Sequence, residues 1–223
     1  MHQRKSKKIL IYFFLFLIIG SLNNKNLINI NFAKINEITV KGLDDKNNLE
    51  LMENLKFLKL NNLFFLKKKD ITDIINSNNL VENYSVYKKY PSTINIEIDK
   101  AKFLAQLKKD NKLYLLGSNG RLIEKTNYKD NIPFIFGDFN NKNFFELKDV
   151  IDKSSFDYGD IKNFFFFKSG RWDIETKNGL LIKLPKDNLK KSFQFLNSIL
   201  NQDKEKKIIK IDLRQYNQII IYE

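Results

Sequence analysis

The feature that most constrains this chain is an apolar run close to its N-terminus. Residues 9–22 (ILIYFFLFLIIGSL) contain no charged side chain, and residues 1–8 carry four basic residues and no acidic one. Fourteen helical residues reach only about 21 Å, short of a hydrocarbon core of about 30 Å, so a spanning helix would have to continue toward residue 27. We therefore predict a cytoplasmic basic tail at 1–8 and a transmembrane helix at 9–27 with its apolar core at 9–22.

A cleaved secretory signal peptide is the alternative, because its apolar region is typically as short as this one. No small-x-small cleavage motif follows the run, and the nearest candidate, Asn31-Phe32-Ala33, has an unsuitable residue two places before the alanine. This favours an uncleaved anchor. Under both interpretations the rest of the chain crosses the membrane, and the basic flank keeps the N-terminus inside.

Composition excludes several kinds of active site. The chain has no Cys, and its one His is His2 in the basic tail, so Cys nucleophiles, Ser–His–Asp triads and His-rich zinc sites are absent. The carboxylates Asp44-Asp45, Asp157 and Asp160 lack the spacing of a calcium loop. Gly117–Gly120 lacks the Lys and the following helix of a phosphate loop. We expect no catalytic residue, no cofactor and no metal ion.

The net charge is +13, from 39 Lys+Arg against 26 Asp+Glu, but only four of the basic residues are Arg. Specific recognition of phosphates and bases favours the planar Arg fork. We therefore expect no specific nucleic-acid binding. A secreted or anchored polyanion-binding protein remains the alternative that the charge supports.

Residues 33–101 predict an α+β module. Residues 36–41 alternate between apolar and polar side chains and end at Gly42, which is typical of a half-buried strand. Leucines at helical spacing (Leu51, Leu55 and Leu58) predict one helix, and Asp70 is a plausible N-cap for a second. Two alternating strands, 84–90 and 94–98, on either side of Pro91, complete the order β-α-α-β-β.

Residues 102–223 predict a larger mixed β-sheet module with helices. Asn178-Gly179 between two alternating segments is the strongest hairpin signal, and it suits a type I′ turn. Trp172 at the start of a strand indicates a core position, and the Phe run 164–167 indicates a strand buried on both faces. The expected strands are 113–116, 121–124, 164–167, 171–177, 180–184, 209–213 and 219–222, with helices near 144–151 and 189–200.

This order, with several motifs, resembles the FtsQ/DivIB family of bacterial division proteins. In the first module the resemblance rests on Ile38–Gly42, on Asn62–Leu66 as "NLF-x-L", and on Tyr90–Ile96 with its proline, as in the family's POTRA domain. In the second it rests on Leu115–Ile123, Ile132-Pro133 with Gly137, Arg171–Ile174 with Asn178-Gly179, and Ile211–Arg214. The structural motif residues are Gly42, Pro91, Gly120, Trp172 and Gly179.

The resemblance implies a non-catalytic, single-pass protein of the cell inner membrane, with its N-terminus cytoplasmic, its bulk periplasmic, and enrichment at midcell during division. In that family the extracytoplasmic part binds FtsB and FtsL, links early to late division proteins and controls septal peptidoglycan synthesis. The POTRA domain meets other divisome proteins. A POTRA-containing secretion or assembly component is the alternative.

The chain ends on an apolar segment that could accept a partner strand. Three β-branched residues and an aromatic follow a turn-like stretch, and nothing after Arg214 protects an edge strand except Glu223. Such an edge could bind FtsB or FtsL by β-augmentation. An ordinary inner strand is the alternative. The predicted partner-binding residues are Arg214, Tyr216, Ile219, Ile220, Ile221 and Tyr222.

Overall fold

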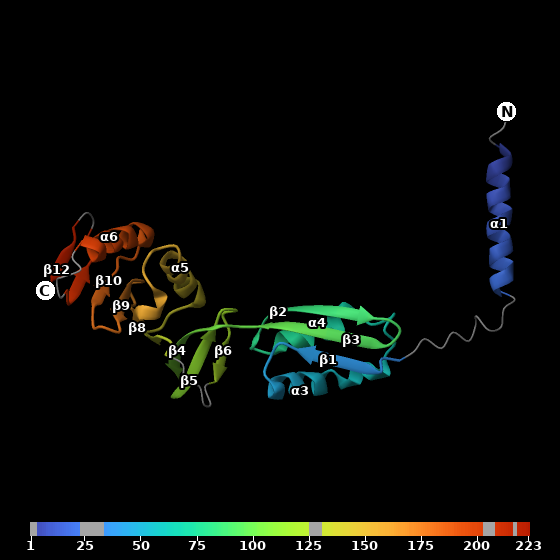
Figure 1. Cartoon of the computed structure of the whole chain (residues 1–223), viewed down its shortest axis with the longest axis horizontal. Helices are drawn as coiled ribbons and strands as arrows, with labels where there is room; N and C mark the ends of the chain where they lie inside the picture. Colours follow the sequence, from blue (N-terminus) through green and yellow to red (C-terminus); the bar gives the residue numbers. More distant parts are fainter. Residues whose placement is uncertain (1–3, 23–33, 125–130, 203–207, 216–217) are drawn as a thin grey trace. The chain divides into compact units, whose positions relative to one another are not determined.

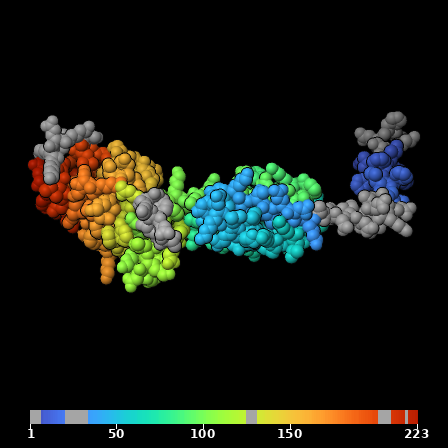
Figure 2. All heavy atoms as spheres, turned by 60° about the horizontal axis from the view of Figure 1, so that its bottom comes forward, coloured from blue at the N-terminus to red at the C-terminus, as the bar shows by residue number. Residues whose placement is uncertain are grey.

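The computed structural model describes residues 4–22, 34–124, 131–202, 208–215 and 218–223 (Figure 1). The chain divides into two compact units, one formed by residues 1–74 and 85–97 and the other by residues 75–84 and 98–223. The space-filling view shows one face of the part that begins at residue 34, in blue to green, and one face of the part that follows it, in green to red (Figure 2). The α+β class predicted from the sequence is confirmed.

The N-terminal apolar run forms helix α1 (Arg4–Leu22). Its large apolar side chains between Ile9 and Ile19 are 45–75% exposed. Among the described residues, no helix has both the length and the apolar character needed to cross a membrane. The remainder of the predicted segment, residues 23–27, lies outside the described residues.

The first module folds in the predicted order. A three-stranded sheet has the order β1-β3-β2, and β1 runs parallel to β3 with Ile38 opposite Ile94. Gly42 has φ +114°, a conformation open to glycine, where the chain leaves β1 for the first helix. The elements are β1 (Glu37–Lys41), α3 (Asp45–Asn54), the 3₁₀-helix η1 (Lys56–Leu60), α4 (Lys68–Ser77), β2 (Val81–Lys89) and β3 (Thr93–Lys100).

The predicted helices of this module differ in detail. Leu51, Leu55 and Leu58 are all buried, but α3 ends at Asn54 and the last of them lies in η1. The spacing of three between the last two leucines suits the three residues per turn of a 3₁₀-helix. The N-cap assigned to Asp70 is wrong, because α4 begins two residues earlier. Asp70 instead lies in the first turn, where its charge favours the helix dipole.

The second module is built on a nine-stranded sheet of order β12-β11-β10-β9-β8-β7-β4-β5-β6. Strand β7 runs parallel to both β4 and β8, and β10 runs parallel to β11. The strands are β4 (Phe103–Lys109), β5 (Lys112–Gly117), β6 (Leu122–Glu124), β7 (Phe134–Phe136), β8 (Ile161–Phe166), β9 (Trp172–Thr176), β10 (Leu181–Lys183), β11 (Lys210–Asp212) and β12 (Ile220–Tyr222). The helices are α5 (Asn141–Asp152), η2 (Tyr158–Asp160) and α6 (Leu189–Gln202).

Helices α5 and α6 lie near the strands of the second module (Figure 1), and side chains of both helices belong to one hydrophobic core with the sheet. Its centre is aromatic: the Phe144 ring meets Phe164 edge-on at 5.8 Å and Trp172 at 6.3 Å between centroids. All three side chains are at most 2% exposed. Edge-to-face contacts of this kind add to the free energy of burial. The strand that carries Trp172 is therefore held firmly in place.

Two predictions about turns and burial are wrong in this module. Asn178-Gly179 is not a type I′ turn, because Gly179 has φ +89° but Asn178 has no positive φ. The turn with positive φ at both central residues joins β4 to β5, at Asp110 (49°) and Asn111 (60°). The Phe run 164–167 is not buried on both faces: only Phe164 is fully buried, and Phe167 is 37% exposed.

Candidate partner-binding edge and basic cavity

The C-terminal strand β12 lies at one edge of the nine-stranded sheet. It pairs antiparallel with β11 and has no second neighbour among the strands that the structure describes. Its side chains are 37–45% exposed. An edge strand of this kind offers one row of backbone donors and acceptors to an added strand.

The two faces of β12 differ. Ile221 lies opposite Ile211, which is fully buried in the core. Tyr222 lies opposite Lys210, whose Nζ is 3.4 Å from the centroid of the tyrosine ring, a cation–π contact. Ile220 follows the same face as Tyr222, because side chains alternate along a strand. Ile220 and Tyr222 are therefore presented together, on the face away from Ile221.

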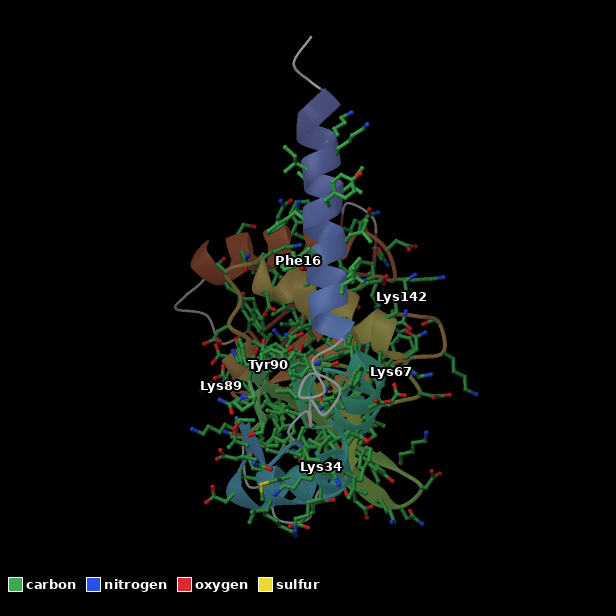
Figure 3. All side chains as sticks on the ribbon, turned by 90° about the vertical axis from the view of Figure 1, so that its right-hand side faces the viewer. Phe16, Lys34, Lys67, Lys89, Tyr90 and Lys142 are labelled. Atoms are coloured by element: carbon green, nitrogen blue, oxygen red, sulfur yellow. The ribbon has the colours of Figure 1, made fainter. Side chains whose placement is uncertain are left out.

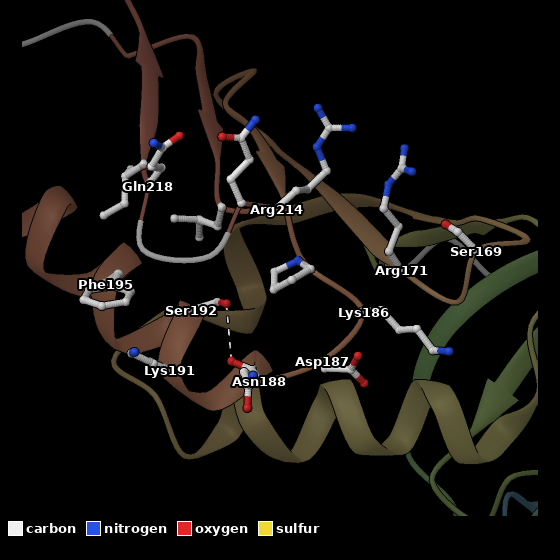
Figure 4. A pocket seen from close by; sticks show the side chains of 14 residues that line it. Ser169, Arg171, Lys186, Asp187, Asn188, Lys191, Ser192, Phe195, Arg214 and Gln218 are labelled. Atoms are coloured by element: carbon white, nitrogen blue, oxygen red, sulfur yellow. Dashed lines mark hydrogen bonds between the residues drawn. The ribbon is translucent and has the colours of Figure 1, made fainter.

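A cavity of about 590 Å³ lies next to the segment that leads into β12. It is bounded by the start of α6, by residues near the β8–β9 turn and by the chain that follows β11 (Figure 4). Ser192 Oγ donates a hydrogen bond to the carbonyl oxygen of Asn188 at its floor. The lining residues are Ser169, Arg171, Pro185, Lys186, Asp187, Asn188, Lys191, Ser192, Phe195, Leu213, Arg214, Gln215, Gln218 and Ile219.

The cavity is basic. Four of its lining residues are cationic, namely Arg171, Lys186, Lys191 and Arg214, against one carboxylate, Asp187. The side chains of Arg171 and Arg214 extend in the same direction (Figure 4). Two of the chain's four arginines therefore line the same cavity, which suits the recognition of carboxylates.

Arg214 is fixed in direction by Asp212. Its Nε donates to both carboxylate oxygens, at 2.8 and 3.0 Å, and its Nη2 donates to Oδ2 at 2.6 Å. These hydrogen bonds lower the pKa of Asp212 and raise that of Arg214. The guanidinium side chain remains 39% exposed. It is therefore preorganised and can still reach a ligand.

Arg171 is held differently. Its guanidinium lies 4.1 Å from the centroid of the Phe167 ring, and its Nε is 3.6 Å from Oδ1 of Asp173. That distance is too long for a hydrogen bond, and neither atom has a hydrogen-bond partner among the residues that the structure describes. Burial raises the pKa of Asp173, although Arg171, Lys183 and Arg214 oppose the shift. Of the four cations that line the cavity, Arg171 and Arg214 thus each lie beside a buried carboxylate, Asp173 and Asp212 respectively.

The structure brings most of the predicted partner-binding residues together. Arg214 and Ile219 line the cavity, and Ile220, Ile221 and Tyr222 form β12. Tyr216 lies outside the described residues. The sequence did not single out Lys186 and Lys191 as part of this site. Their only signal is a basic run near the start of a predicted helix, and nothing in it indicates the strands that lie opposite.

No group of three or more His, Cys, Asp or Glu side chains that could hold a metal ion occurs in the part of the chain that the structure describes. The geometry is an open strand edge, among the described strands, beside a basic cavity. It can add a partner's strand and neutralise the partner's carboxylates.

Two family models match the chain. The model described as "POTRA domain, FtsQ-type" matches residues 33–100, and the one described as "Cell division protein FtsQ/DivIB, C-terminal" matches residues 105–214. Their junction agrees with the end of β3 at Lys100. Between them they account for most of the chain after the N-terminal segment.

The chain is also similar to curated proteins that are named as cell division proteins. The cell division protein DivIB of Clostridium botulinum (strain Hall) is 27% identical over 133 residues, 60% of this chain and 51% of that protein. The cell division protein FtsQ of Rickettsia bellii is 23% identical over 196 residues, 84% of this chain and 72% of that protein. The chain thus spans about half the length of the clostridial relative.

A solved extracytoplasmic domain of DivIB from Geobacillus stearothermophilus aligns with a TM-score of 0.35 at 13% identity, over 49% of this chain and 99% of that domain.

Proposed function

The chain belongs to the FtsQ/DivIB family of cell division proteins, and from that premise we propose that it is a non-catalytic, single-pass inner-membrane protein that binds FtsB and FtsL at the septum. Through this binding it links early to late division proteins and controls septal peptidoglycan synthesis. Its POTRA domain contacts other divisome proteins.

The membrane part of the proposal rests on residues 9–22 and their basic flank. The segment is charge-free, its described side chains are exposed in α1, and the flanking lysines can extend toward a headgroup layer. We assign the anchor to residues 9–27, with residues 1–8 in the cytoplasm and the bulk in the periplasm. Mass spectrometry of protein extracted from membranes should find residues 1–22 still attached. A mature N-terminus near Lys34 in a soluble fraction would exclude the anchor.

The observation that carries the partner-binding part is the open edge of β12 beside the basic cavity. An extended partner segment that pairs with β12 would gain backbone hydrogen bonds. Ile220 and Tyr222 would supply side-chain selectivity on one face. Carboxylates of the same segment would meet Arg171 and Arg214 at the cavity. The partner should therefore present an extended apolar segment with acidic residues near one end.

The test is capture of FtsB by the full chain in mild detergent. Ile220→Lys and Tyr222→Ala should each abolish capture, while the melting temperature stays within a few degrees because both side chains are already more than a third exposed. Ile123→Lys is the matched control, since β6 is the opposite edge of the same sheet. It should leave capture intact.

A second variant tests the charge. Lys186→Glu reverses one exposed charge at the cavity without touching β12. Because rim charges act mainly on encounter, association with FtsB should slow and lose part of its salt dependence. Capture that survives both β12 variants, or that is lost equally in Ile123→Lys, contradicts the edge-strand site.

A further inference from the structure

One end of the POTRA module exposes large apolar side chains. Leu60 is 74% exposed, Phe65 73%, Tyr90 57% and Phe64 55%. The rings of Phe64 and Tyr90 lie 4.7 Å apart, so residues far apart in sequence form one surface. Their neighbours Leu58, Leu63 and Leu66 are buried. The exposed residues are therefore not part of the module's buried core. We call Leu60, Phe64, Phe65 and Tyr90 the apolar end patch.

Backbone contacts place this patch around the point where the chain enters the module. Lys34 forms a β-bridge with Asn62, and the amide of Ile35 donates to the carbonyl of Asn61 at 3.1 Å. The amide of Asn36 donates to the carbonyl of Ser92 at 2.9 Å. Residues 34–36 thus run between the loop that carries Phe64 and the turn that carries Tyr90.

The same end is strongly basic. Between Leu55 and Lys69, and again between Asn83 and Ile96, the sequence contains no Asp or Glu. Figure 3 looks onto this end and shows Lys34, Lys67, Lys89 and Tyr90 on it. The lysines in these segments and at the entry point are Lys34, Lys56, Lys59, Lys67, Lys68, Lys69, Lys88 and Lys89; of these, Lys56 is ion-paired with Glu53 and Lys88 is hydrogen-bonded within the module.

Lys88 links strand β2 to the loop that carries Phe64 and Phe65. Its Nζ donates to the carbonyl oxygens of Leu63 and Leu66, at 3.0 and 3.1 Å. The loop with Phe64 and Phe65 is therefore fixed to β2 at two points on either side of the aromatic pair. A fixed loop can present both rings without ordering itself on contact.

We propose that the apolar end patch and its lysines rest on the anionic headgroup surface of the membrane. This inference rests on the proposed N-terminal anchor. The proposed anchor ends at residue 27, so residues 28–33 separate it from Lys34, and at 3.3–3.6 Å per residue these six residues reach at most about 22 Å. The patch is thereby kept near a lipid surface. Aromatic rings partition to the headgroup level and lysines are attracted to anionic lipids, so the composition matches that surface.

The test places a probe beside the patch in the full chain. Because the chain has no Cys, Asn61→Cys gives a single labelling site next to Leu60 for a fluorophore. The protein is reconstituted into vesicles of phosphatidylglycerol and phosphatidylcholine that also carry headgroup-region spin-labelled lipid. A label at Leu113→Cys, a 41% exposed position on β5, is the control. Quenching should be markedly stronger at the Asn61 site.

Two variants, made on the labelled chain, separate the apolar and basic contributions. Leu60→Ser with Phe65→Ser should reduce the quenching in all vesicles. Lys67→Gln with Lys69→Gln should reduce the ratio of docked to undocked protein about thirtyfold in anionic vesicles, the effect of two surface lysines, and little in pure phosphatidylcholine. An unchanged circular dichroism spectrum shows that each variant is folded.

The outcomes distinguish the two proposals. Failure of the unaltered chain to float with vesicles overturns the anchor and, with it, this inference. Flotation with equal quenching at both labels overturns only the membrane contact. Quenching that neither pair of substitutions reduces also overturns only the membrane contact. Loss of midcell enrichment in the Leu60/Phe65 variant without any excess quenching in the parent assigns the patch to a protein partner instead.

Discussion

Replacing Arg214 by Ala should destabilise the second module in a pH-dependent way. The guanidinium makes three hydrogen bonds to the carboxylate of Asp212, whose side chain is only 7% exposed. A hydrogen bond to a charged group contributes about 1.5–3 kcal/mol. The Arg214 side chain is 39% exposed, so solvent screening reduces the expected loss to about 1–2 kcal/mol at pH 7.

The pH dependence has a definite sign. The hydrogen bonds from Arg214 lower the folded-state pKa of Asp212 below its unfolded value, which is near 3.9. The ionised carboxylate therefore stabilises the fold above about pH 4, and this stabilisation is lost as the pH falls through the folded value. The free-energy difference between parent and variant should be full at pH 7 and should shrink in acid.

The assay is urea unfolding of the full chain in detergent, followed by the fluorescence of Trp172. This is the only Trp, it is 2% exposed, and it lies in β9 of the same sheet, so it reports this module alone. Arg214→Lys keeps the charge but not the two-nitrogen fork, and should fall between parent and Ala. Equal stability at pH 7, or a difference that persists unchanged at acid pH, would refute the argument.

Three further outcomes are expected. Gly137→Ala should lower the free energy of unfolding, followed by Trp172 fluorescence, by at least about 2 kcal/mol, because φ is +99° and the added Cβ would contact the carbonyl of Phe166. Gly179→Ala should cost about half as much, because φ is +89° there but the added Cβ would meet open space. Asp173→Asn should gain stability relative to the parent as the pH rises from acid to neutral. Burial raises the folded pKa of Asp173, so the parent loses stability through that range. Gel-shift assays should find DNA binding by the full chain weak, independent of base sequence and steeply reduced by salt.

The fold of the POTRA module could be predicted because its segments each carry one clear period. Strand residues 36–41 and 94–98 alternate, and the leucines of the first helix face one side. The end of α3 at Asn54 could not be foreseen, because a spacing of three residues fits the last turn of an α-helix and a 3₁₀-helix equally well.

The fold of the second module is less predictable from the sequence than that of the POTRA module, for a different reason. Strands β4 and β7 were missed, and β7 is only three residues long, too short to show a period. The hairpin at Asp110-Asn111 carries no glycine, so it did not match the usual type I′ signal although both residues adopt positive φ. Asn178-Gly179 matched that signal but forms another turn. Local turn chemistry alone did not decide between the two.

Of the candidate site, the sequence predicts the strand and the two cavity-lining residues Arg214 and Ile219, but not the cavity itself. An apolar C-terminal segment without edge protection is visible in the sequence, and it forms the edge strand β12. The cavity is not visible, because Arg171, Lys186 and Arg214 lie on three separate segments that only the nine-stranded sheet brings together. Non-local pairing of β10 with β11 creates that neighbourhood, and no local pattern encodes it.

The basic cavity beside the open edge should also disfavour the pairing of β12 with a second copy of itself. Two β12 strands brought together would also bring together two sets of cationic rims, each with four basic side chains and one acidic one. Like-charge juxtaposition disfavours that arrangement, while an acidic partner segment gains from the same charges. The edge is short, at three residues, which further limits what self-pairing could contribute. We therefore expect charge at the cavity to influence which strands the edge accepts, with Arg171 and Arg214 lying beside the buried carboxylates Asp173 and Asp212.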